Sequence, residues 1–101
     1  MVDLTVAIRT YNGEKYLREL LDKLRSQINT DNIIWEIVVV DNNSTDNTAK
    51  IIQEYQLKDS KHCPINYYFE SRQGASFARA KAMQEAKAPL VGFLDDDNLV
   101  K

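Results

Sequence analysis

Three consecutive aspartates include a pair that could hold a divalent metal ion and, through it, a phosphorylated ligand, and a fourth aspartate ends another apolar run. Asp95, Asp96 and Asp97 directly follow one apolar run, and Asp41 ends another. Carboxylates about 6 Å apart repel one another by roughly 2 to 3 kcal/mol per pair, which a bound cation offsets. Alternate residues of an extended chain point the same way, so Asp95 and Asp97 could reach one ion. Such oxygen ligands suit Mg²⁺ or Mn²⁺.

The elements that would position these aspartates alternate between strand and helix patterns. Runs of β-branched residues indicate strands, and apolar residues at helical spacing indicate helices. The predicted strands are Leu4–Ile8, Ile33–Val40, Pro64–Glu70 and Leu90–Leu94. The predicted helices are Glu14–Ile28, one opened by the stretch DNNSTDNT, and Gly74–Lys87. The alternation predicts an α/β domain with a Rossmann-like, open, mainly parallel sheet of about four strands and about three helices. Ile33–Val40 suits its centre and Pro64–Glu70 a place nearer an edge.

Composition excludes several functional classes. The chain has 101 residues, 13 basic and 15 acidic, with a formal net charge of −2. This balance provides no electrostatic surface for nucleic acid. Cys63 is the single cysteine and cannot form an internal disulfide. The sequence shows no secretion signal and no apolar run near the ~20 residues of a membrane span, so we expect a cytoplasmic protein.

Ligands of open parallel sheets bind outside the carboxyl ends of the strands. The residues at those predicted ends are Arg9–Asn12, Asp41–Asn43, Glu70–Arg72 and Asp95–Asp97. A dinucleotide-binding loop would need G-x-G-x-x-G after the first strand, where RTYNGEKYL has only Gly13. An EF-hand would need glycine and glutamate where Asp46 and Ile52 stand. Asp41 also has a simpler interpretation, as a helix cap or the start of an Asx turn.

Four ordered motifs resemble those of the inverting family 2 glycosyltransferases of the GT-A fold. They are VAIRTYN, EIVVVDNNSTDNT, QGASFARA and FLDDDN, and together they span nearly the whole chain. The resemblance implies a domain that binds a nucleotide-diphosphate sugar through Mn²⁺ or Mg²⁺. It also implies inverting transfer of the sugar to an acceptor hydroxyl, as in polysaccharide or glycoconjugate synthesis.

The resemblance assigns roles to particular residues. Thr10, Tyr11 and Asp41 would hold the nucleobase and ribose, with Tyr11 against the base ring. Asp95 and Asp97 would form the D-x-D pair at the metal, and Arg79 would lie near the diphosphate. The full set of nucleotide-binding candidates is Thr10, Tyr11, Asn12, Asp41, Asn43, Arg79, Asp95 and Asp96, and the metal candidates are Asp95 and Asp97.

Three residues depart from the family pattern. Arg9 replaces a proline, which adds a positive charge beside the expected nucleotide site. Asn43 stands where glycine is common, so the loop after Asp41 is expected to turn differently. Ala80 replaces an asparagine and removes a polar contact. None of the three belongs to the expected metal pair.

In the family that the chain resembles, the acceptor-binding half and the general base follow the D-x-D segment. We therefore expect residues 1–101 to form a single domain, the donor-binding half, with the general base beyond Lys101 and no sugar transfer by this part alone. The alternative is a non-catalytic nucleotide-binding or assembly module. A phosphotransfer enzyme fits less well, because Thr10-Tyr11-Asn12 stands where a nucleophilic aspartate is usual. Surface that the other half would cover could allow homo-oligomers, and the cytoplasmic face of a membrane is a compatible location.

Overall fold

In the computed structural model, which describes residues 2–27, 34–57 and 64–95, a four-stranded parallel sheet is combined with three helices. The strands are β1 (Leu4–Thr10), β2 (Trp35–Asp41), β3 (Ile65–Phe69) and β4 (Leu90–Asp95). The helices are α1 (Leu17–Gln27), α2 (Thr48–Leu57) and α3 (Ala75–Glu85). The strand order is β3-β2-β1-β4, and every neighbouring pair is parallel. The predicted fold class is confirmed.

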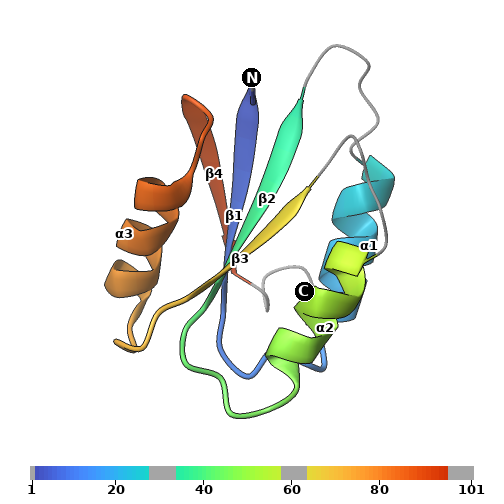
Figure 1. The fold of residues 1–101 in the computed structure, drawn as a ribbon, viewed down its shortest axis with the longest axis vertical. Coiled ribbons are helices and arrows are strands. Elements are labelled where there is room, and N and C mark those ends of the chain that lie inside the picture. Colours follow the sequence, from blue (N-terminus) through green and yellow to red (C-terminus); the bar gives the residue numbers. More distant parts are fainter. Residues whose placement is uncertain (1, 28–33, 58–63, 96–101) are drawn as a thin grey trace.

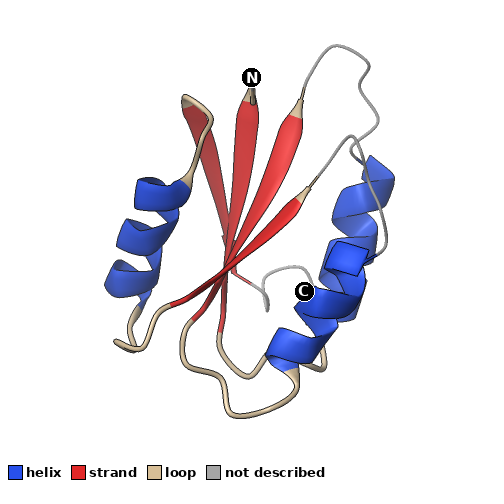
Figure 2. Ribbon diagram, viewed as in Figure 1, coloured by secondary structure: helices blue, strands red, loops and turns tan. Residues whose placement is uncertain are grey.

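The helices form layers on both faces of the sheet. Figures 1 and 2 show α1 and α2 on one face and α3 on the other. The larger core lies under α1 and α2, and its most deeply buried side chains include Leu17, Leu20, Leu21, Ile37 and Ile52. Each such burial contributes roughly 1.5 to 3 kcal/mol. Among the described residues, no helix is both long enough and apolar enough to cross a membrane.

The opposite face of the sheet is covered by small residues. Ala78 and Ala82 are the buried residues of α3 and pack on Ala7, Val38 and Val40. The sequence places Phe77, Ala78, Ala82 and Ala86 on one side of this helix, which predicts close packing of small residues on the sheet. Ala78 and Ala82 confirm this prediction, whereas it is wrong for Phe77, which is 39% exposed and lies against the guanidinium of Arg72.

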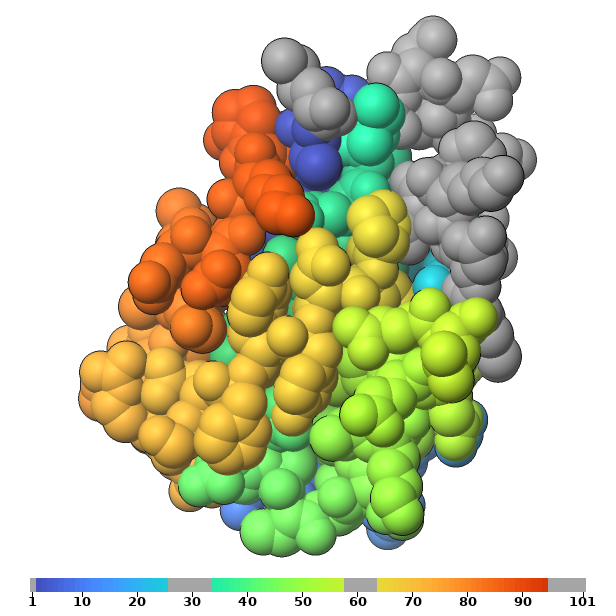
Figure 3. All heavy atoms as spheres, in the orientation of Figure 1, coloured from blue at the N-terminus to red at the C-terminus, as the bar shows by residue number. Residues whose placement is uncertain are grey.

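The central and edge positions of the strands follow from their composition. Residues 37–40 of β2 are almost fully buried on both faces, as a central parallel strand requires. β3 pairs only with β2 within the described chain and carries more polar side chains, which confirms the expected edge position. Figure 3 shows the atoms of this edge strand, in yellow, at the front of the molecule between α3 and α2.

Several element boundaries differ from those predicted. α1 begins at Leu17, after a turn over residues 14–16 in which the N–H of Tyr16 donates to the Gly13 carbonyl at 2.9 Å. The N–H groups of Gly13 and Glu14 donate to Thr48 Oγ1 and Asp46 Oδ2. β1 continues to Thr10, because its pairing with β2 runs on as far as Asp41. α3 ends at Glu85, since the next residue is extended. The predicted ends Ile28 and Ile33 lie outside the described residues.

Candidate functional site

The carboxyl ends of β1, β2 and β4 meet at one edge of the sheet. Thr10 pairs in register with Asp41 on one side of β1, and Arg9 pairs with Asp95 on the other. Two strand spacings correspond to about 10 Å, so the backbones at the ends of β2 and β4 are that far apart. The chain order reverses between β1 and β4, which is where open α/β sheets bind ligands.

A small cavity lies between α3 and the carboxyl-terminal parts of β1 and β4. Its volume is about 40 Å³, and its lining residues are Ala7, Ile8, Arg9, Val40, Ala75, Ala78, Arg79, Ala82, Phe93 and Leu94. A volume of this size holds about one water molecule, so a nucleotide would lie outside it. The cavity brings two arginines to the point where the strand order reverses: Arg9, the departure from the family pattern, and Arg79, the candidate for the diphosphate.

Arg79 is an exposed residue of α3 that reaches toward β4. Its guanidinium carbon lies 5.1 Å from the centroid of the Phe93 ring, within the range of a cation–π contact. This contact orients the side chain over the strand that ends at Asp95. The guanidinium offers several donors in a fixed plane, an arrangement that matches phosphate oxygens.

The Asp41 carboxylate is buried and has hydrogen-bond partners on both oxygens. Oδ1 accepts from the N–H of Ser44 at 2.9 Å, and Oδ2 accepts from the hydroxyl of Tyr67 at 2.7 Å. Burial, followed by the hydrogen bond to Asp41, raises the pKa of Tyr67 above its ordinary value. Asp41 therefore does form the local turn that its simpler interpretation predicted, while α2 is capped by Asp46, which accepts from the N–H of Thr48. The role of Asp41 in nucleotide binding stays a prediction.

Tyr11 and Asn12 follow β1; the side chain of Tyr11 is exposed, whereas that of Asn12 is hydrogen-bonded to the loop after β2. The Tyr11 side chain is 46% exposed at the site edge, as a ring that stacks on a base must be. The side-chain Oδ1 of Asn12 accepts from the N–H of Thr45 at 2.7 Å, and the backbone N–H of Asn12 donates to Ser44 Oγ at 2.9 Å. Asn12 thus joins the loop after β1 to the loop after β2.

Asn43 has a backbone φ of 69°, in the left-handed region. Glycine prefers this region, and asparagine is one of the few other residues that enter it readily. The replacement of glycine by Asn43 therefore retains the conformation that glycine would favour, whereas the sequence had suggested a different turn. Its side-chain amide donates to the carbonyl of Ser71 at 3.4 Å.

Asn42 belongs to the strand-end residues Asp41–Asn43 that the sequence indicated, but it was not among the predicted nucleotide-binding residues, and its supporting contacts were not foreseen. It is 1% exposed, and its amide nitrogen donates to the carbonyls of Glu70 and Arg72 at 3.2 and 2.8 Å. Its Oδ1 accepts from the N–H of Gly74 at 3.0 Å. One side chain thus holds the whole loop between β3 and α3 against the end of β2. The only signal in the sequence is a polar residue directly after a buried strand.

The loop held by Asn42 also contains an ion pair. The carboxylate of Glu70 accepts from Arg72 Nε at 3.1 Å, from Arg72 Nη2 at 3.0 Å and from the Arg72 backbone N–H at 2.9 Å. The side-chain hydrogen bonds, followed by the backbone one, lower the pKa of Glu70 to about 2. The guanidinium carbon of Arg72 also lies 4.7 Å from the centroid of the Phe77 ring. Arg72, one of the residues at the predicted strand ends, is therefore engaged in local contacts.

The structure describes little of the expected metal pair. The backbone of Asp95 ends β4, whereas Asp96 and Asp97 lie outside the described residues. Within residues 2–27, 34–57 and 64–95, no group of three histidine, cysteine, aspartate or glutamate side chains could hold a metal ion. A metal at this edge would depend on Asp95 and Asp97, whose carboxylates are the ligand type that Mg²⁺ and Mn²⁺ prefer.

Comparisons with known proteins converge on one family. The family described as Glycosyl transferase family 2 matches residues 5–101. The poly(ribitol-phosphate) beta-N-acetylglucosaminyltransferase TarS of Staphylococcus aureus is 33% identical over 100 residues, which is 99% of this chain and 17% of that protein. Glycosyltransferase GlyA of Streptococcus pneumoniae is 35% identical over 98 residues, 97% of this chain and 13% of GlyA. The chain thus spans less than a fifth of either relative.

Solved structures agree with the sequence relatives. TarS 1–349 in complex with UDP-GlcNAc superposes with a TM-score of 0.78 at 31% identity, covering 95% of this chain and 27% of that one. Mannosyltransferase PcManGT from Pyrobaculum calidifontis, in complex with GDP-Man and Mn²⁺, superposes with a TM-score of 0.83 at 27% identity. That match covers 93% of this chain and 27% of the mannosyltransferase.

Proposed function

We propose that this chain, which belongs to glycosyl transferase family 2, forms the donor-binding part of an enzyme that moves a sugar from a nucleotide-diphosphate sugar to an acceptor hydroxyl. The observation that carries this proposal is the meeting of Thr10, Asp41 and Asp95 at one sheet edge, with Thr10 paired to Asp41 and Arg9 to Asp95. Residues 1–101 would form one donor-binding domain. The acceptor-binding part and the general base would come from the remainder of the protein.

The nucleoside would lie over the ends of β1 and β2. The exposed ring of Tyr11 is available to stack on the base. Each carboxylate oxygen of Asp41 has a second lone pair beyond the hydrogen bond that it already accepts, so Asp41 can also accept from a base N–H. The bonds from Ser44 and Tyr67 keep that carboxylate in place before the ligand arrives. Such preorganisation lowers the entropic cost of binding.

The diphosphate would lie toward β4. Arg79, oriented over Phe93, and Arg9 supply positive charge beside this strand. Asp95 and Asp97 would hold Mn²⁺ or Mg²⁺, and the bound ion would stabilise negative charge on the departing diphosphate. The Mn²⁺ in the GDP-Man complex of PcManGT supports this assignment. Attack of the acceptor hydroxyl opposite the diphosphate would invert the anomeric carbon.

Three further expectations stay predictions. They are a cytoplasmic location, association with the cytoplasmic face of a membrane, and self-association. Cell fractionation tests the first two, and sedimentation equilibrium tests the third.

A thermal-shift screen with UDP, GDP, dTDP and CDP tests the proposal and identifies the base. Each nucleotide is added with Mn²⁺ and, separately, with a chelator. One nucleoside diphosphate should raise the melting temperature, and only in the presence of the ion. Equal stabilisation in the chelator would rule out the metal-bridged part of the proposal, and no stabilisation by any of the four would rule out donor binding by this chain.

A further inference from the structure

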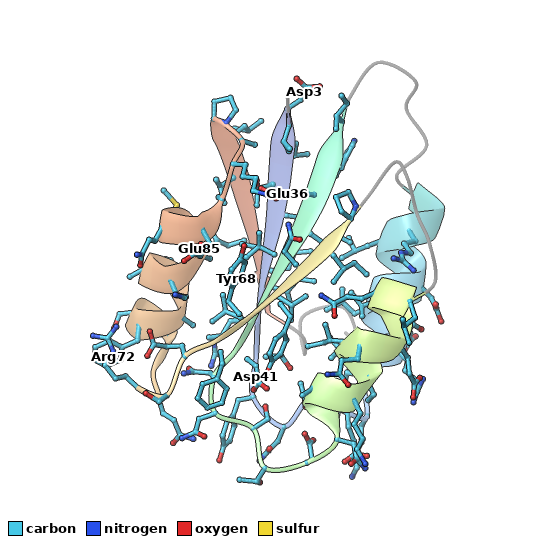
Figure 4. All side chains as sticks on the ribbon, viewed as in Figure 1. Asp3, Glu36, Asp41, Tyr68, Arg72 and Glu85 are labelled. Carbon is cyan, nitrogen blue, oxygen red and sulfur yellow. The ribbon has the colours of Figure 1, made fainter. Side chains whose placement is uncertain are left out.

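A buried carboxylate lies at the end of the sheet opposite the proposed site. Glu36 of β2 is 1% exposed, and its Oε2 accepts from Thr5 Oγ1 at 2.6 Å and from the backbone N–H of Lys87 at 2.8 Å. Its Oε1 accepts from the side-chain amide of Asn66 at 3.0 Å. The Thr5 hydroxyl oxygen accepts from the N–H of Ala88 at 3.3 Å. We call these five residues, Thr5, Glu36, Asn66, Lys87 and Ala88, the Glu36 network. Figure 4 shows Glu36 and Asp41 toward opposite ends of the sheet.

The Glu36 network connects three strands to the segment that leads into β4. Thr5 and Glu36 are register partners on β1 and β2, and Asn66 is on β3. Lys87 and Ala88 lie between the end of α3 and the start of β4. A carboxylate buried without hydrogen bonds is costly. Glu36 accepts from one backbone N–H, that of Lys87, and from the side chains of Thr5 and Asn66. The position of the chain just before β4 is therefore determined by side chains of β1 and β2.

The side chains of β4 alone specify its register weakly. The strand is apolar on both faces, with Val91 packing toward α3 and Leu94 toward α1 and α2. Neither of these side chains is fully buried, and Leu90 and Phe93 are 63% and 40% exposed. Gly92, in the middle of the strand, has no side chain and adds no apolar contact to either face. A shift by one residue exchanges the two faces of a strand, and a hydrophobic pattern opposes that shift only where one face is clearly the buried one.

We infer that Glu36 is a positioning residue for the donor site. By holding Lys87 and Ala88, the Glu36 network sets the register of β4 on β1 and so determines that Asp95 arrives opposite Arg9. The inference that this affects ligand binding rests on the proposed function; the inference about register does not. Glu36, although far from the expected ligand, would thus determine where the aspartate at the end of β4 lies.

The test compares variants of the chain that differ in the network. Glu36→Leu keeps a similar volume but leaves the donors of Lys87 and Asn66 unpaired. Glu36→Gln retains an acceptor for Lys87, and Asn66 can rotate its amide to match it. Leu24→Ala, in the core under α1 and outside the Glu36 network, lowers stability without removing any of the network's hydrogen bonds and serves as the control for destabilisation alone. Thr5→Val, which removes only the hydroxyl, replaces Glu36→Leu if the latter does not fold.

Three readouts are taken on each variant. The first is hydrogen exchange of the β4 amides relative to those of β2, and the second is the set of backbone nuclear Overhauser contacts between Ala7 and Phe93, which are register partners. The third is the dissociation constant of UDP in the presence of Mn²⁺. In Glu36→Leu, β4 amides should exchange at least about tenfold faster relative to β2, since hydrogen bonds to a charged group are lost. The register contacts should weaken and UDP affinity should fall, with Glu36→Gln close to wild type.

Each outcome decides the inference. The inference about register is wrong if Glu36→Leu, or Thr5→Val where that variant is used, keeps wild-type exchange of the β4 amides and wild-type register contacts. It is also wrong if Leu24→Ala loses β4 protection and register contacts to the same extent, because general destabilisation then explains the result. If the wild-type chain binds neither UDP nor another nucleoside diphosphate, the proposed function fails, while exchange and register contacts still decide the role of Glu36.

Discussion

The hydroxyl of Tyr67 on β3 donates a 2.7 Å hydrogen bond to Oδ2 of Asp41 at the end of β2. The bond joins an edge strand to the acid that we expect to contact the nucleobase. A hydrogen bond to a charged group is worth about 1.5 to 3 kcal/mol. Tyr67→Phe should therefore lower the free energy of unfolding by about 1.5 kcal/mol, measured by urea denaturation.

The neighbouring substitution Tyr68→Phe is the matched control, because it keeps the ring on which the Lys81 ammonium lies, 5.8 Å from the centroid. It should change stability far less than Tyr67→Phe. Equal effects of the two substitutions would show that the bond to Asp41 contributes nothing particular.

Asn42 should be among the most sensitive polar residues of the chain. Asn42→Ala removes three hydrogen bonds to the loop between β3 and α3 and leaves the buried carbonyl of Glu70 without this partner, at a cost of about 2 to 4 kcal/mol. Asn47→Ala, at an exposed position, removes one 3.4 Å side-chain hydrogen bond to Glu14 and should cost much less. Chemical denaturation measures both, and a cost for Asn42→Ala no greater than that for Asn47→Ala would contradict the structural role.

The left-handed backbone of Asn43 predicts opposite effects for two small substitutions. Asn43→Gly should be neutral or nearly so, because glycine adopts the φ of 69° without steric strain. Asn43→Ala should lower stability by about 1 kcal/mol, since a Cβ is disfavoured there. The difference in melting temperature between the two variants is the measurement. A more stable alanine variant would mean that the turn has another conformation.

Glu70 should make stability depend on pH in acid. Its pKa in the folded chain is about 2, below the ordinary value of 4.5. The unfolded chain therefore takes up the proton first as the pH falls, so the contribution of Glu70 is complete above about 4.5 and is lost between about 4.5 and 2. The stability difference between wild type and Glu70→Gln should shrink over that range. A stability difference that stays constant between pH 4.5 and 2 would contradict the pairing of Glu70 with Arg72. Glu19→Gln, which removes a carboxylate from a surface pair with Lys23, provides the control.

The fold was predictable because its signals are local. The apolar runs that became β2 and β4, and the helical spacing of Leu17, Leu20, Leu21 and Leu24, are visible without tertiary information. The boundaries were less predictable, because they depend on distant partners. The N–H of Gly13 donates to Thr48 Oγ1, 35 residues away, so the segment between β1 and α1 is held by a contact that no local pattern shows.

The meeting of the candidate residues at one sheet edge was predictable from the sequence, but the contacts that support them were not. Motif order placed Thr10, Asp41 and Asp95 at strand ends, and strand pairing confirms that these ends meet at one edge. No short pattern indicated that Asn42 would hold a loop 30 residues away. Nor did any pattern indicate that Glu36 would be buried and accept a hydrogen bond from Lys87, just before β4. Both are single polar residues next to apolar runs, and only the folded chain reveals their partners.

Paramagnetic line broadening by Mn²⁺ measures most directly whether a metal-bound nucleotide lies where β1, β2 and β4 end. Mn²⁺ is titrated into the isotope-labelled chain together with the nucleoside diphosphate that gives the largest thermal shift. The amide signals of Thr10 and Asp95 should broaden first, those of Leu4 and Trp35 at the other end of the same sheet should keep their widths, and Asp97→Ala should abolish the effect. Broadening that is centred on Leu4 and Trp35, or that survives in Asp97→Ala, would contradict the proposed site.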